Sequence, residues 1–263
     1  MMYKLWMMAC MAAGLAACSA PQRKISVQEE NTTAKSLLQG IWLDDNTEVA
    51  LLKVTGDTLY YADAGTAPVA FRIVGDSLMT YGARTNSYKI EKQGEYIFWF
   101  YTANGDMLRL HKADNARDSL TFLRVQEVVQ PREVIQKDKV VMYDKVRYRG
   151  YVYINPSSIK VMRPGVSEEG IGVDNVYYDN IIHICVYEGK KSLFAKDIRK
   201  QMFQGVVPDA FLQGSILSDM DFLRVDADGY HYQATVCIPD EALSYLVHLT
   251  ATPQGDLSFE LVE

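Results

Sequence analysis

Short strand-like segments separated by glycine turns fill the first half of the chain. Nine such segments follow one another between residues 40 and 125, at a spacing of roughly ten residues and with no helical stretch between them. Gly56, Gly75 and Gly105 stand between segments and supply the positive φ that tight hairpin turns need. The last of the nine is expected at 119–125. The pattern predicts an antiparallel barrel or sandwich over residues 36–126.

The tripeptide Gly40-Ile41-Trp42 resembles the Gly-x-Trp entry of lipocalin-like barrels. The resemblance implies a Trp that closes one end of a barrel whose interior holds an apolar ligand. In segment 95–101 the side chains of Tyr96, Phe98 and Phe100 share one face. The candidate cavity residues are therefore Trp42, Tyr96, Phe98 and Phe100. The alternative is that Trp42 is a core residue of an ordinary β-meander.

The second half, residues 140–263, is predicted to be an antiparallel sheet crossed by one helix. Ser192 is a good helix cap, apolar residues recur at helical spacing, and Gly205 ends the pattern, which predicts a helix over 192–204. A second short helix is expected around 208–217. Polar residues 127–139, which include a proline, are expected to form the domain linker. The fold class is therefore mainly β, with two domains. The expected strands are 146–154, 181–187, 221–225, 230–238, 243–251 and 257–262.

Tyrosine and arginine alternate at the start of this second half. On a strand from residue 146, the side chains of Arg147, Arg149, Tyr151 and Tyr153 point to one face. Tyr and Arg are enriched at protein interfaces, so these four residues form a candidate binding surface for a protein or a glycan. The alternative is that the tyrosines fill a β-rich fold. Because segment 95–101 is apolar on both faces, we also expect the two domains to pack together near residues 147–153.

The polar residues do not form a recognisable catalytic or metal-binding pattern. The four histidines lie far apart in the sequence, and no nucleophile elbow, His-Glu-x-x-His or Walker loop is present. We therefore predict no catalytic residue, metal or cofactor, and a protein that is not an enzyme. A net charge of −6 without a basic stripe argues against nucleic acid as a partner. Cys185 and Cys237 form either a disulfide or two buried free thiols. The histidines are His111, His183, His231 and His248.

The N-terminus has the features of an export signal. Lys4 precedes an uncharged run over residues 5–17, which is too short to span a membrane, and Leu15-Ala16-Ala17-Cys18 follows its apolar core. This tetrapeptide resembles the lipobox of bacterial lipoproteins. The resemblance implies removal of residues 1–17, acylation of Cys18 and anchoring in a membrane through the acyl chains. Ser19 favours the outer membrane, facing the periplasm. Residues 18–35 are expected to form a flexible tether.

From about residue 148 to its end, the chain resembles a domain of unknown function found in lipoproteins of Bacteroides and their relatives. The resemblance rests on the order of Ile181 to Lys190, Phe222 to Val225, Asp228-Gly229 and Cys237 to Asp240. It implies an envelope lipoprotein and brings no catalytic residues. The sequence as a whole therefore predicts a non-enzymatic binding module for a periplasmic protein or glycan. The alternative is a lipocalin-like carrier of a small apolar ligand.

Overall fold

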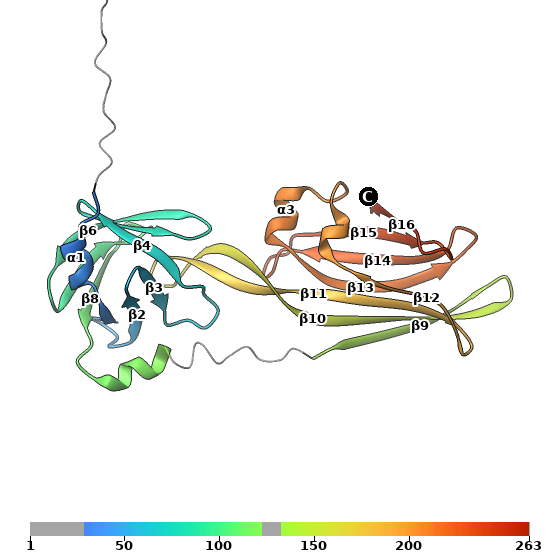
Figure 1. Ribbon diagram of the computed structural model, residues 1–263, viewed down its shortest axis with the longest axis horizontal. Helices are drawn as coiled ribbons and strands as arrows, with labels where there is room; N and C mark the ends of the chain where they lie inside the picture. Colours follow the sequence, from blue (N-terminus) through green and yellow to red (C-terminus); the bar gives the residue numbers. More distant parts are fainter. Residues whose placement is uncertain (1–28, 123–132, 263) are drawn as a thin grey trace, which may run out of the picture.

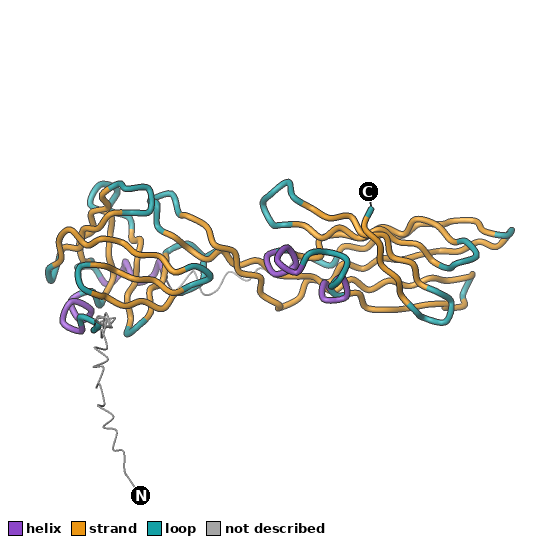
Figure 2. Tube along the Cα trace, turned by 90° about the horizontal axis from the view of Figure 1, so that it is seen from above, coloured by secondary structure: helices purple, strands orange, loops and turns teal. Residues whose placement is uncertain are grey.

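The structure, a computed structural model, describes residues 29–122 and 133–262. An N-terminal barrel and a C-terminal two-sheet sandwich lie at the two ends of an elongated molecule, and a long two-stranded ribbon joins them (Figure 1). The view from above shows the same arrangement (Figure 2). The predicted mainly-β fold is confirmed. The predicted signal sequence, Cys18 and the first part of the tether lie outside the described residues, as do residues 127–132 of the predicted linker.

Eight antiparallel strands in chain order close into the predicted barrel, because β1 pairs with β8 as well as with β2. Gly56, Gly75 and Gly105 adopt positive φ at three of the turns, as expected. Alternation along the strands directs one face inward; in β4 the buried residues are Val69, Phe71 and Ile73. The strands are β1 (Gly40–Asp44), β2 (Ala50–Thr55), β3 (Thr58–Tyr61), β4 (Val69–Val74), β5 (Ser77–Tyr81), β6 (Thr85–Gln93), β7 (Ile97–Tyr101) and β8 (Met107–Lys112).

One end of the barrel is covered by the short helix α1 (Thr32–Leu37), which corrects the expectation of a tether up to residue 35. Asn31 caps this helix by accepting a hydrogen bond from the backbone N–H of Ala34 at 3.0 Å. Lys35 holds the helix on the barrel through ion pairs of 2.6 Å with Glu30 and 2.7 Å with Asp57. The ordered body therefore begins before residue 35.

The ribbon consists of β10 (Val146–Val166) and β11 (Gly172–Glu188), which pair along almost their whole length. Its turn, near residues 166–172, enters the barrel end opposite α1. There Ile171 and Val173 are 4% and 6% exposed and belong to the barrel core. The backbone N–H of Gly172 donates to the Tyr88 hydroxyl at 2.7 Å, and Asp174 accepts from the N–H of Ala83 at 2.7 Å. The second domain thus closes the barrel of the first.

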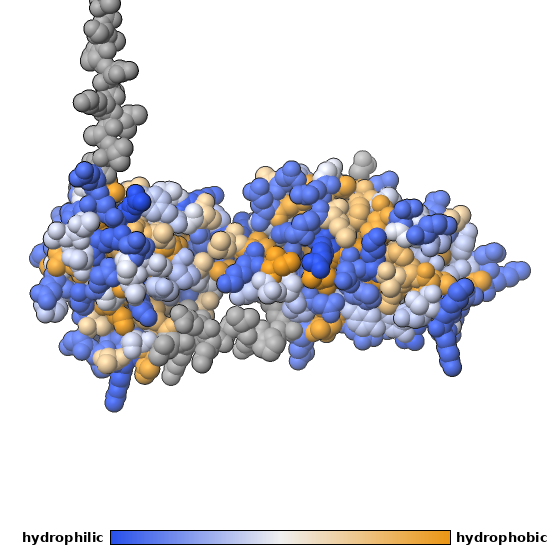
Figure 3. All heavy atoms as spheres, viewed as in Figure 1, coloured by the Kyte–Doolittle hydropathy of each residue, from blue (hydrophilic) through white to orange (hydrophobic). Residues whose placement is uncertain are grey.

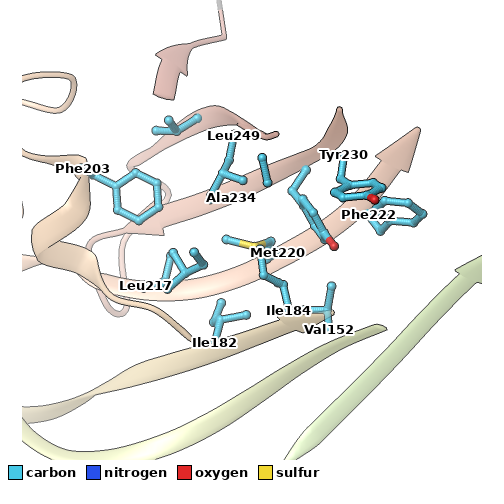
Figure 4. Packing of buried hydrophobic residues seen from close by; sticks show 14 of the residues in the cluster. Val152, Ile182, Ile184, Phe203, Leu217, Met220, Phe222, Tyr230, Ala234 and Leu249 are labelled. Carbon is cyan, nitrogen blue, oxygen red and sulfur yellow. The ribbon is translucent and has the colours of Figure 1, made fainter. Parts of the chain in front are cut away.

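The sandwich packs a sheet of order β12-β11-β10-β9 against a sheet of order β13-β14-β15-β16. Figure 4 shows the core between them: Val152, Ile182 and Ile184 of the first sheet face Met220 and Ala234 of the second. The remaining strands are β9 (Ile135–Tyr143), β12 (Lys191–Ile198), β13 (Ile216–Val225), β14 (Tyr230–Cys237), β15 (Ser244–Ala251) and β16 (Leu257–Leu261).

Residues 192–204 do not form the predicted helix. They contain most of strand β12, followed by the 3-10 helix η2 (Lys200–Phe203). The buried residues Phe194 and Ile198 are four apart, a spacing that fits one face of a helix and one face of a strand equally well. The helix in the C-terminal domain is instead α3 (Asp209–Gly214), within the second expected helix.

Two other boundaries differ from the sequence prediction. Where a strand was expected at 119–125, the described residues 119–122 form a helical turn. This turn follows the 3-10 helix η1 (Ala116–Asp118), which Asn115 caps. Strand β9 starts at Ile135, inside the predicted linker 127–139, because it pairs with β10 over nine residues. The domain contact also differs, because the ribbon turn forms it. The segment 147–153 lies at the other end of β10, where residues 149–153 pair with Tyr187 to His183.

Candidate functional site

The outward side of the sheet β12-β11-β10-β9 carries a cluster of aromatic and charged side chains. We call Arg149, Tyr151, Tyr153, His183 and Tyr187 the aromatic face. They come from alternate positions of β10 and β11, while the positions between them are buried against the second sheet. Cross-strand register brings the two strands together: Arg149 lies opposite Tyr187, and Tyr153 lies opposite His183. Arg147 continues the row at an exposed position, so the four predicted surface residues do share one face.

The rings of this face support one another. The Tyr151 and Tyr153 rings are nearly parallel, at 17°, with centroids 6.1 Å apart. The Arg149 guanidinium lies 5.0 Å from the Tyr151 centroid, and the Tyr187 ring meets Tyr151 edge-on at 5.8 Å. Because Arg149 and Tyr153 flank Tyr151 along the strand, both faces of the Tyr151 ring are occupied. What Tyr151 offers a partner is therefore its edge and its hydroxyl.

Charged neighbours fix the position of the polar groups on this face. Arg149 donates to Asp138 on β9 at 2.7 Å and 2.9 Å, and His183 Nδ1 lies 2.7 Å from Asp197 Oδ1 on β12. Partial burial, followed by the nearby Cys185 thiol, raises the pKa of the Tyr153 hydroxyl. That hydroxyl therefore stays protonated at neutral pH and can donate a hydrogen bond.

Cys185 and Cys237 are free thiols, so the predicted alternative of a disulfide between them is wrong in this structure. In β11 the core side holds Ile184 and Val186, which directs Cys185 away from the second sheet. In β14 the core side holds Ala234 and Val236, which directs Cys237 outward from the opposite sheet. The thiols therefore point away from each other. Burial also raises the pKa of Cys185, which keeps this thiol protonated and unreactive.

The predicted cavity residues split into two groups. Trp42, Phe98 and Phe100 are fully buried in the barrel, with the Trp42 and Phe98 centroids 5.8 Å apart and Phe98 and Phe100 5.1 Å apart. The Trp42 indole donates to the Leu38 carbonyl at 2.8 Å, which fixes the ring below α1. Tyr96 is 64% exposed, because it precedes β7 and lies in the turn before that strand. Its assignment to the interior is therefore wrong.

A hydrogen-bonded cluster on the second sheet was missed by the sequence analysis. His231, 3% exposed, lies 2.6 Å from Asp226 through Nε2 and 3.2 Å from His248 through Nδ1. Thr250 Oγ1 lies 3.1 Å from the same Nδ1. Only the register of β14 and β15, which places His231 opposite Thr250, brings these residues together. The cluster ties the turn after β13 to strand β15.

This cluster predicts a pH-dependent contribution to stability. The hydrogen bond from His231 lowers the pKa of Asp226 to about 2. A carboxyl whose pKa is depressed on folding stabilises the native state above its unfolded value and loses that effect as pH falls toward the folded value. We expect Asp226→Asn to lower the urea midpoint at pH 6, and the deficit to shrink between pH 4 and pH 2. Asp228→Asn, in the same turn, is the control, and a deficit that stays constant down to pH 3 would contradict the assignment.

A buried pair of opposite charges lies beside the crossover to the second sheet. Lys200 donates to the Ser215 carbonyl, and its Nζ is 3.8 Å from Asp179 Oδ2. Burial lowers the pKa of Lys200. Asp179 also accepts from the backbone N–H of Leu217 at 2.8 Å and of Asn180 at 3.0 Å. These partners satisfy the pair internally, which indicates a structural role in fixing η2 and β13.

The described residues contain no group of three or more His, Cys, Asp or Glu side chains arranged to hold a metal ion. Nor does any helix within them combine the length and apolar character needed to span a membrane. No curated protein matches the chain. A family model described as a domain of unknown function, DUF4738, matches residues 115–259, which include the ribbon and the sandwich up to the last strand, β16. Because this match extends over more than half of the 263 residues, the protein belongs to the DUF4738 family.

Proposed function

We propose that the protein is a lipid-anchored envelope lipoprotein of the Bacteroides type that binds a periplasmic protein or glycan without converting it. The aromatic face carries this proposal. It combines Tyr and Arg, the residues most enriched at binding hot spots, on a flat outward sheet surface. Its side chains are held in place by ring contacts and ion pairs, so little conformational entropy is lost when a partner binds.

The position of this face within the molecule supports the same role. The barrel lies at one end of the molecule, and the sandwich part of β10 and β11, which carries the aromatic face, lies toward the other end (Figure 1). The proposed anchor at Cys18 is closer in sequence to the barrel than to the binding surface. The carrier alternative gains no support from the barrel interior, which is filled by the rings of Trp42, Phe98 and Phe100.

Loss of the aromatic side chains should weaken partner binding while leaving the fold intact. We expect Tyr151→Ser with Tyr153→Ser to weaken binding by about tenfold or more, because hot-spot truncations typically cost at least 1–2 kcal/mol. Two measurements check this: the binding of each variant to a glycan array, and the yield of cross-linked partner protein on intact cells. Tyr96→Ser, which removes a 64% exposed tyrosine from the barrel, is the matched control. Equal binding by both variants would refute the role of this face.

The anchor is tested separately. Cys18→Ala removes the only thiol that the lipobox resemblance marks for acylation, so the variant should take up no alkyne-labelled fatty acid in a Bacteroides-type host. The unprocessed precursor should accumulate in its place. Cys185→Ala, which changes a buried thiol in β11, should label like the wild type. Persistent labelling of Cys18→Ala would exclude lipidation at this residue.

A further inference from the structure

Strand β9 forms one edge of its sheet, and its pairing with β10 is regular. It pairs with β10 over nine residues without a register shift, whereas the β10–β11, β11–β12 and β13–β14 ladders each contain an irregularity. Bulges are a common device by which proteins block the pairing of an edge with another chain. β9 also exposes Ile135, Val140 and Met142, at 53%, 39% and 65%. A regular edge with exposed apolar side chains is suited to accept a further strand.

The turn between β9 and β10 determines which backbone groups face outward. Asp144 and Lys145 have φ of 45° and 64°, as in a two-residue type I′ turn, which makes Tyr143 and Val146 a hydrogen-bonded pair. In an antiparallel ladder such pairs alternate with pairs whose N–H and C=O groups point away from the partner strand. Among the described residues, no backbone hydrogen bond outside the ladders involves β9. The outward-pointing groups are therefore those of Gln136, Asp138, Val140 and Met142.

The same residues present their side chains beside the aromatic face. Asp138 and Val140 lie opposite Tyr151 and Arg149 in the register, on the outward side of the sheet. The alternate lysines point the other way: Lys137 binds Asp219 at 2.6 Å and Lys139 donates to the Leu223 carbonyl. They hold β9 against the second sheet and leave the edge itself uncovered by described residues.

Charge indicates the kind of strand that fits. The hairpin 135–149 carries five basic and two acidic residues in a chain whose net charge is −6. Lys145 and Arg147 have no ion-pair partner among the described residues. At the right-hand end of the molecule, where the β9–β10 hairpin ends, the projecting tips are hydrophilic (Figure 3). A second copy of the chain would bring two positively charged hairpins together, which is unfavourable. An acidic segment would be attracted.

We propose that the open edge of β9 accepts an extended, acidic segment of a partner protein as an additional strand. The outward N–H and C=O groups of β9 provide the ladder, and Arg147 and the tyrosine edges contact alternate side chains of the segment. This inference rests on the proposed binding role of the protein. It restricts the proposed partner, a protein or a glycan, to a protein.

The test uses a fluorescent nine-residue peptide of alternating Thr and Glu, titrated by anisotropy into the full chain purified in detergent. The same peptide with Lys in place of Glu is its control. We expect the acidic peptide to bind about tenfold more tightly than the basic one, with the difference falling as salt rises. Equal binding of the two peptides, or none, would overturn the proposal.

Two changes test the ladder itself. Val140→Pro removes one outward N–H without removing a β9–β10 hydrogen bond, and should weaken peptide binding several-fold.

N-methylation of alternate peptide residues tests the same bonds without altering the protein. A peptide methylated at the residues whose N–H groups face β9 should lose binding, and a peptide methylated at the other residues should retain it. Insensitivity to methylation would exclude strand addition. If the peptides fail while Tyr151→Ser with Tyr153→Ser still weakens partner binding, the binding role stands and only the strand-addition mechanism falls.

Discussion

Replacing Val173 with Asp should strongly destabilise the barrel, although Val173 belongs to the C-terminal domain. Its side chain is 6% exposed and packs in the barrel core with Ile171. An unpaired carboxylate at this place costs several kcal/mol, and a barrel of about 90 residues has little stability to lose. We expect the barrel transition to lose at least about 3 kcal/mol in chemical denaturation. The measurement is urea unfolding followed by the near-ultraviolet circular dichroism of the buried Trp42.

Val166→Asp is the matched control. Val166 lies at the same end of the ribbon but is 58% exposed, so the same substitution should change the midpoint little. The sandwich transition should persist in both variants, because its core contains no residue of the ribbon turn. Equal unfolding midpoints for the two variants would show that the ribbon turn does not contribute to barrel stability.

Gly150→Ala should destabilise the sandwich through a direct clash. A Cβ at position 150 would lie 2.3 Å from Cδ1 of the Phe222 ring, which rests on this glycine from the opposite sheet. Phe222 is 4% exposed and packs against Tyr232, so its ring cannot swing into solvent. Overpacking of this kind costs about 1–3 kcal/mol, or more where the backbone must move. Thermal unfolding should show a midpoint lower by several degrees.

A second substitution separates the clash from other effects of alanine. Phe222→Leu removes the ring, so Gly150→Ala should cost clearly less in that background than in the wild type. Gly214→Ala serves as the control, because the nearest atom to its added Cβ is 3.6 Å away and the residue ends α3. An unchanged cost of Gly150→Ala in the Phe222→Leu background would exclude the clash as the cause.

Local patterns predict the barrel well, because each of its hairpins is encoded by neighbouring residues. Glycines with positive φ mark turns, and alternation in segments such as β4 marks the buried face. The part of the aromatic face on β10 was also predictable, since alternation along one strand places Arg149, Tyr151 and Tyr153 together. His183 and Tyr187 were missed, because only the register of β10 with β11 brings them to this face. The spacing of apolar residues failed to predict the structure of residues 192–204, because Phe194 and Ile198 fit one face of a helix and one face of a strand equally well.

The missed features depend on contacts between distant residues. A strand was expected to end at residue 154, before Pro156, yet β10 continues to Val166 after a register shift between Pro156 and Lys160. Nothing local to Ile171 indicates that it completes the core of another domain. The contact of His231 with His248 likewise depends on cross-strand register, and register is fixed by the whole sheet.

The continuity of β10 and β11 between the domains has a mechanical consequence. A pull between the barrel and a partner bound to the sandwich would act along the long axis of the molecule, which is also the direction of the ribbon (Figure 1). Both strands run between the two domains and are joined at the turn, so tension along the axis is carried by the two covalent strands in parallel and does not shear the hydrogen bonds between them. Because the ribbon turn is embedded in the barrel, that load passes from one domain to the other without depending on the chain over residues 123–132.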